Sequence, residues 1–187
     1  MTRQMHKLLP LLLLLWLGCN NAPPTTPETR PVEHPNAGNT AIYDVDPDDP
    51  YEIDDGSFMD MRPGGQLTPF ARRLTPGTLA TAEGERQVRY IKGRGGETLG
   101  YLSEEGGTIG EITLTSTDVV TKNGIRVGNS YGELTERMGA FAEAARVEDK
   151  YTEFSKEGLT YRLEGQAAGG SAADIPPSAR IVAIILR

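Results

Sequence analysis

The chain has 187 residues, with 19 lysines and arginines against 26 aspartates and glutamates, and a formal net charge of -7. Because a surplus of negative charge repels polyanions, this composition argues against nucleic-acid binding. Cys19 is the single cysteine, and the two histidines, His6 and His34, lie near the N-terminus. Beyond His34 the sequence therefore offers no disulfide, no thiol or imidazole for catalysis and no thiolate or imidazole metal ligand. We expect no catalytic residue, no bound metal and no cofactor there.

The N-terminus has the pattern of an export signal. A short cationic stretch containing Arg3 and Lys7 precedes an apolar run, in which residues 11–17 are all Leu or Trp. This order of a charged and an apolar region is typical of a signal peptide. The run is too short to cross a bilayer, which takes about 20 apolar residues.

The segment Trp16-Leu17-Gly18-Cys19 resembles the lipobox of bacterial lipoproteins. The resemblance implies that residues 1–18 are a signal peptide cleaved before Cys19, and that Cys19 carries lipid, including acyl chains such as palmitate. More than one acyl chain gives stable membrane anchoring. Asn20 follows the cysteine, and by analogy this implies the outer membrane, facing the periplasm. The alternative is an ordinary secretory signal, with Cys19 an incidental thiol.

The anchor is followed by a segment that is not expected to fold. Residues 19–40 are rich in proline and almost lack large apolar side chains, so we expect a lipid-anchored, disordered tether. Residues 41–82 are expected to be acidic and rich in loops. Within them, residues 66–80 are rich in Pro, Gly and Thr, which predicts loop with at most a short helical turn around residues 70–73.

The acidic block at residues 44–55 partly resembles a cation site. Asp44, Asp46 and Asp48 have the spacing of ligands in a calcium loop, but Asp49 stands where such a loop needs glycine. We therefore expect a solvated acidic surface, with a weak divalent-cation site as the alternative.

Residues 83–187 contain the patterns of a folded domain. Alternation at Val88 and Tyr90, and again in residues 98–103 and 108–116, predicts an antiparallel meander of three strands. Residues 93–96 include three glycines that weakly resemble a phosphate loop, but they are better explained as a hairpin turn because no lysine-serine or lysine-threonine pair follows.

A helix and further strands are predicted after the meander. Ser130 with Glu133 forms a capping box, and Leu134 and Met138 share one face, so a helix should begin at Ser130 and end near Gly139. Strands are predicted at residues 146–155, 159–163 and 181–186, with a mobile loop at 166–173. Since residues 181–186 are apolar on both faces, this strand should be central and covered on both sides. The predicted class is α+β, a mainly antiparallel sheet with a short helix packed on it.

The helix entry carries a second resemblance. Thr121, Gly124, Ile125, Val127, Gly128, Ser130 and Leu134 look like the corresponding segment of small uncharacterised envelope proteins of Gram-negative bacteria. The same step is similar to the small lipoprotein of the outer-membrane barrel-assembly machinery and to β-lactamase inhibitor proteins. That similarity implies a sheet whose exposed surface binds other proteins.

These observations favour a noncatalytic, membrane-anchored envelope lipoprotein with a structural or protein-interaction domain. Its partners would be the membrane, through lipid on Cys19, and another envelope protein. Two alternatives stay open: a module that binds a small molecule or a divalent cation, and a hydrolase that uses paired carboxylates.

Overall fold

A computed structural model describes residues 49, 51–141, 146–148, 151–165 and 171–187, with backbone alone at 146–148. Residues 41–187 form one compact unit. The predicted signal peptide, Cys19, the tether, Asp44, Asp46 and Asp48 lie outside the described residues, as does most of the loop predicted at 166–173.

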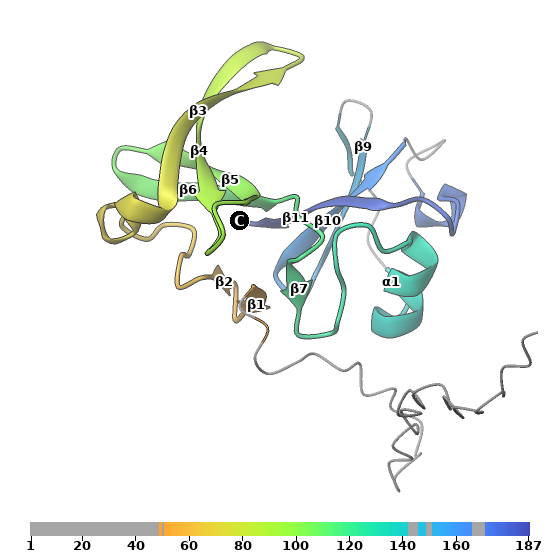
Figure 1. Ribbon diagram of the computed structural model, residues 1–187. Coiled ribbons are helices and arrows are strands. Elements are labelled where there is room, and N and C mark those ends of the chain that lie inside the picture. Colours follow the sequence, from red (N-terminus) through yellow and green to blue (C-terminus); the bar gives the residue numbers. More distant parts are fainter. Residues whose placement is uncertain (1–48, 50, 142–145, 149–150, 166–170) are drawn as a thin grey trace, which may run out of the picture. The chain divides into compact units, whose positions relative to one another are not determined.

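The unit is built around an eight-stranded antiparallel sheet (Figure 1). In spatial order its strands are β3 (Leu74–Thr81), β4 (Gly84–Lys92), β5 (Thr98–Glu105), β6 (Thr108–Leu114), β11 (Ile181–Leu186), β10 (Leu159–Glu164), β9 (Tyr151–Lys156) and β8 (Arg146–Glu148). The predicted three-strand meander is confirmed as β4, β5 and β6. The segment predicted as one strand at 146–155 forms two antiparallel strands, β8 and β9.

A smaller sheet packs against the core of the large one. It consists of β2 (Ser57–Phe58), β1 (Glu52–Asp54) and β7 (Val120–Thr121), with β1 and β7 parallel. Ile53, Phe58 and Met61 from this region are buried in the main hydrophobic cluster. Two 3-10 helices, η1 (Thr68–Arg73) and η2 (Ala172–Asp174), complete the described elements. Within the described residues, no helix is long and apolar enough to cross a membrane.

Helix α1 (Tyr131–Met138) begins as the sequence predicts. The Ser130 side chain accepts from the Glu133 backbone N–H at 3.2 Å, and the Glu133 carboxylate accepts from the Ser130 backbone N–H at 2.7 Å. This is the predicted capping box, and Gly139 caps the other end at a φ of 76°. Tyr131 stacks on Phe154 of β9 with ring centroids 5.5 Å apart, so the helix contacts the sheet through aromatic side chains.

The predicted α+β class is wrong, because the described unit is mainly β. Its one α-helix has 8 residues, and two of them, Tyr131 and Leu134, are buried, which is too little to form a second layer. The loop predicted at residues 66–80 is also wrong over β3, which pairs with β4 from Leu74 to Thr81. Pro76 lies inside this strand; a proline that cannot donate a hydrogen bond is tolerated there because β3 is an edge strand.

Strand β11 lies between β6 and β10, which confirms the predicted central position. Ile184 and Leu186 point into the main hydrophobic cluster with Tyr161 and Leu163 of β10. Ala183 and Ile185 are also buried, yet they do not belong to that cluster. Because successive side chains of a strand point to opposite sides, these two residues lie on the other face of the sheet. Both faces are therefore buried at β11, and the cover on the second face is polar.

Candidate functional site

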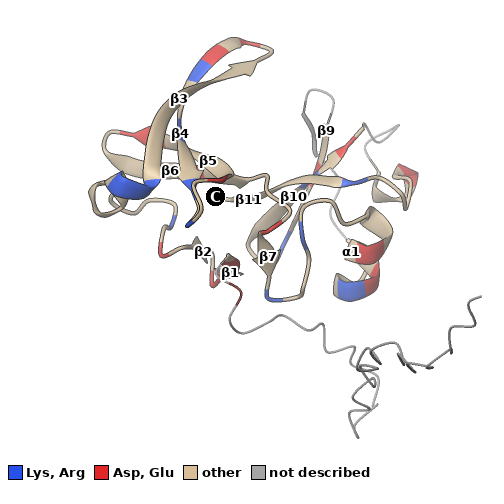
Figure 2. Cartoon of the chain, in the orientation of Figure 1, with Lys and Arg blue, Asp and Glu red and all other residues tan. Residues whose placement is uncertain are grey.

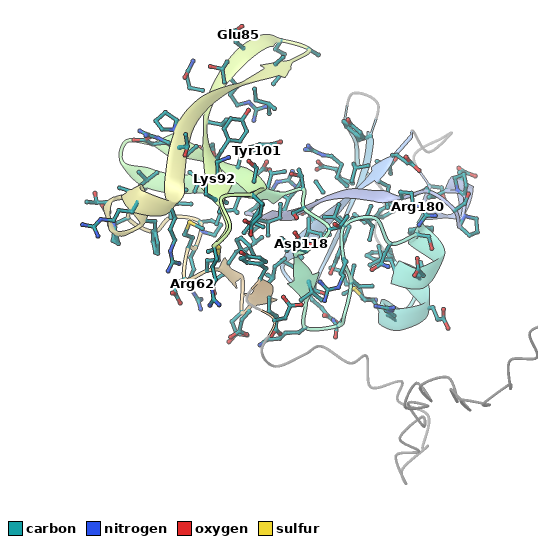
Figure 3. All side chains as sticks on the ribbon, viewed as in Figure 1. Arg62, Glu85, Lys92, Tyr101, Asp118 and Arg180 are labelled. Atoms are coloured by element: carbon teal, nitrogen blue, oxygen red, sulfur yellow. The ribbon has the colours of Figure 1, made fainter. Side chains whose placement is uncertain are left out.

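The second face of the sheet is lined by polar side chains around β11. The register places Tyr101, Thr113, Ile185 and Thr160 side by side on neighbouring strands, and paired residues point to the same side. By alternation this side, called the polar face below, also carries Glu111, Glu153, Arg162, Ala183 and Arg187. Figure 3 shows Tyr101 on the side of the sheet toward which the β3–β4 hairpin rises.

Four charged side chains of the polar face form one connected network. Glu153, which is 3% exposed, accepts hydrogen bonds from Arg162 Nε at 2.7 Å and from Arg187 Nη2 at 2.8 Å. Arg187 also donates from Nε to Glu111 Oε2 at 2.7 Å and from Nη1 to Thr160 Oγ1 at 3.1 Å. Two carboxylates and two guanidinium groups are thus neutralised together, which allows them to cover the apolar Ala183 and Ile185.

The pKa directions agree with a permanently ionised network. Burial acts to raise the pKa of Glu153, but hydrogen bonds and charges from Arg187 and Arg162 outweigh it and lower the pKa. Burial acts to lower the pKa of Arg162 and of Arg187, and the bonds to carboxylates again outweigh it, so both pKa values are raised. A general acid needs the opposite direction, a raised carboxyl pKa. The geometry therefore does not favour a carboxylate-based hydrolase at this place.

A cavity of about 210 Å³ lies on the polar face. Its lining comes from five strands and includes Arg86, Tyr101, Tyr151 and Arg162, together with Leu79, Ala80 and Thr81. The sheet therefore curves, so that the end of the β3–β4 hairpin and the β9–β10 hairpin flank one hollow. The Arg162 guanidinium carbon lies 5.6 Å from the centre of the Tyr151 ring, a cation–π contact that orients both side chains.

The β3–β4 side of this hollow is held by Tyr90. Its hydroxyl donates to the Thr78 carbonyl at 3.0 Å, and its ring lies over Gly77, where an added Cβ would come within 2.2 Å of a ring carbon. Glycine at position 77 thus leaves room for the Tyr90 ring to pack across β3 and stabilise the β3–β4 hairpin. The hollow is built on paired strands rather than on loops.

The acidic block does not form a metal centre in the part that is described. Asp49 accepts from Arg126 Nη2 at 2.7 Å, while Asp54 and Asp55 both pair with Lys122. Among the residues the structure describes, no group of three or more His, Cys, Asp or Glu could hold a metal ion. These acids instead form ion pairs that join the β1 region to the segment around β7.

The glycines of residues 93–96 form a hairpin turn between β4 and β5, as predicted.

The ion network of the polar face was not predicted. Its sequence signal is the polar half of each alternating strand, a pattern that does not distinguish an ion network from a solvent-exposed face. The contacts of Arg187 with Glu153 and Glu111 span 34 and 76 residues, so no local pattern indicates them.

Comparison with known proteins gives no family for this chain. No protein-family model matches it, and no curated protein matches it.

A search of solved structures finds the crystal structure of the uncharacterized protein YfeY from Escherichia coli. The match has 18% sequence identity and a TM-score of 0.48, and it covers 68% of this chain and 92% of YfeY. At this level of similarity it supports no statement about function.

Proposed function

We propose that this protein is a noncatalytic envelope lipoprotein that binds a partner protein through the polar face of its sheet. The observation that carries the proposal is the hollow between the β3–β4 and β9–β10 hairpins, floored by a neutralised ion network and lined by tyrosine and arginine. The proposed partner is another envelope protein, and the proposed anchor is lipid on Cys19.

The chemistry of the hollow fits a protein partner. Tyrosine and arginine are enriched at the energetically important positions of protein interfaces. Arg162 is half-buried and held by Glu153 and the Tyr151 ring, Tyr101 is half-buried, and Arg86 is exposed at the rim. Because the side chains are already ordered, a partner would meet a low entropic cost on binding.

The interface can be tested by site-specific photo-crosslinking in cells. A photoreactive amino acid at position 101 should give one adduct of defined mass with an envelope protein, and the additional change Arg86→Glu should reduce its yield. The control is the same amino acid at Glu136, an exposed position of α1. Equal adducts at both positions, or no adduct at position 101, would contradict the proposed face.

The anchor is tested separately. We expect Cys19→Ala to release the protein from the membrane fraction and to remove the mass of the lipid. A Cys19→Ala protein that stays in the membrane fraction with an unchanged mass would refute the lipoprotein assignment but not the proposed binding face.

A further inference from the structure

A second cavity, of about 310 Å³, lies on a different part of the unit from the polar-face hollow. It is lined by Arg73 at the end of η1, by Lys92 and Gly93 at the end of β4, by Arg94 in the following turn, and by Met59 and Asp60 after β2. Figure 2 shows the basic residues of η1 beside the end of β4. Three cationic side chains, from η1 and from the end of β4 with its following turn, therefore line one space.

The charges of this cavity are not balanced by the protein around it. Arg73, Lys92 and Arg94 form no ion pair with a carboxylate of the described residues, and Asp60 is the one acid among the lining residues. Elsewhere, carboxylates pair with the cations Arg89, Lys122, Arg126, Arg162 and Arg187. In a chain with more acids than bases, three cations without an ion pair beside a single acid create a local positive potential that an anion from outside would neutralise.

The frame of the cavity is fixed by buried and hydrogen-bonded groups. The Tyr51 hydroxyl donates to Glu97 Oε1 at 2.5 Å and accepts from the Arg94 backbone N–H at 2.8 Å, so Arg94 is held at its backbone. Glu97, the acid nearest to Arg94 in sequence, accepts this bond and forms no ion pair with Arg94. Gly93 permits the arrangement, because an added Cβ would come within 2.6 Å of the Tyr51 hydroxyl.

The opposite wall is a tight turn. Phe58 and Met61 exchange two backbone hydrogen bonds of 2.9 Å, and the residues between them, Met59 and Asp60, have φ values of 52° and 67°. The Met59 carbonyl accepts from Arg73 Nη1 at 3.5 Å, and Lys92 donates to Thr98 Oγ1 at 2.6 Å. Each of these contacts uses one donor of a side chain that has several, so donors remain for a ligand.

We infer that this cavity binds a phosphate group. Two arginines can present paired N–H donors to phosphate oxygens, and a lysine adds a point charge, which is the recurring chemistry of phosphate recognition. A volume of about 310 Å³ is large enough for a phosphate with part of the molecule that carries it. The same chemistry could be supplied by free phosphate or a small phosphate ester, or by the headgroup of a phosphate monoester lipid. This site is independent of the proposed binding face.

The test is isothermal titration of the full chain at fixed ionic strength with three probes: inorganic phosphate, dihexanoyl phosphatidic acid and dihexanoyl phosphatidylcholine. The short-chain lipids stay monomeric at low concentration, so the titration reports the binding of single lipid molecules rather than of a micelle or bilayer. We expect saturable binding of phosphate or phosphatidic acid and none of phosphatidylcholine. Tighter binding of phosphatidic acid would identify the lipid headgroup as the source, and equal or tighter binding of inorganic phosphate would identify a soluble ligand.

Substitutions link the binding to the cavity. Arg73→Gln and Arg94→Gln should each weaken binding about tenfold, the effect of losing one charge-assisted contact. Arg72→Gln is the matched control, since Arg72 is an exposed neighbour on η1 that does not line the cavity. Circular dichroism would verify that each variant is folded. No saturable binding by the folded wild-type chain, or equal weakening by Arg72→Gln and Arg73→Gln, would overturn the assignment.

Discussion

The ion network of the polar face leads to a quantitative prediction for Glu153→Gln. The substitution keeps the size of the side chain and removes its charge, which leaves Arg162 and Arg187 without their shared carboxylate. Hydrogen bonds to charged groups contribute about 1.5 to 3 kcal/mol each, and breaking a buried ion pair from one side costs about 3 to 5 kcal/mol. The Arg187 side chain is 40% exposed and keeps Glu111, which reduces the cost. We expect a loss of about 2 to 3 kcal/mol in the free energy of unfolding.

Urea unfolding followed by far-ultraviolet circular dichroism measures this loss. The matched control is Glu104→Gln, which breaks the ion pair between Glu104 and Arg89. In this pair the Arg89 side chain is 32% exposed and the Glu104 side chain 35% exposed. Exposed pairs contribute at most about 1 kcal/mol, so the control should change little. If Glu153→Gln costs less than about 0.5 kcal/mol, or no more than the control, the network does not stabilise the sheet in the way its geometry indicates.

The same network predicts the pH dependence of stability. Because the folded-state pKa of Glu153 lies below its ordinary value of 4.5, its contribution is complete above that value and is lost as the pH falls through the folded-state pKa. The wild-type chain should therefore lose more stability than Glu153→Gln on acidification below pH 4.5. Parallel pH profiles of the two proteins would contradict this linkage.

Three further substitutions test the fold, each by urea unfolding. Ser130→Ala removes the helix cap and should cost about 1 kcal/mol, whereas the exposed Ser178→Ala should cost almost nothing. Gly100→Ala would place a Cβ 2.2 Å from the Thr113 carbonyl oxygen on the neighbouring strand, so we expect a loss of about 1 to 3 kcal/mol or more; an unchanged midpoint would show that the strands can separate locally. Tyr161→Phe removes a buried hydroxyl that lies near Thr121 without a hydrogen bond of normal geometry, and stability should stay the same or rise by up to about 1 kcal/mol; a clear loss would show that the hydroxyl does bond to Thr121.

Local signals in the sequence predicted local structure well. Ser130 and Glu133 define the start of α1 because a capping box needs residues three positions apart and nothing else. The six apolar residues of β11 predicted a central strand because no other place in a sheet buries both faces.

Interactions between distant segments explain what the sequence did not predict. Strand β3 contains Pro76 and Gly77, which suggest a loop, and it is a strand because an edge position tolerates proline and Tyr90 packs over the glycine. The three cations of the phosphate cavity are likewise brought together by the fold, since Arg73 and Lys92 meet through the pairing of β3 with β4.

The order of the strands has a consequence for how the protein reaches its native state. Strand β11 follows all other described strands in the chain, yet it joins β6 to β10 in the middle of the sheet. Before β11 is present, the β3–β6 meander and the β8–β10 meander are separate pieces. Strands β6 and β10 then each have an unpaired edge at the centre of the future sheet. Such edges promote association between chains. The sheet can therefore be completed only after β11 has been synthesised. A nonsense mutation shortly before Ile181 would leave an aggregation-prone product, although every other described strand has been made.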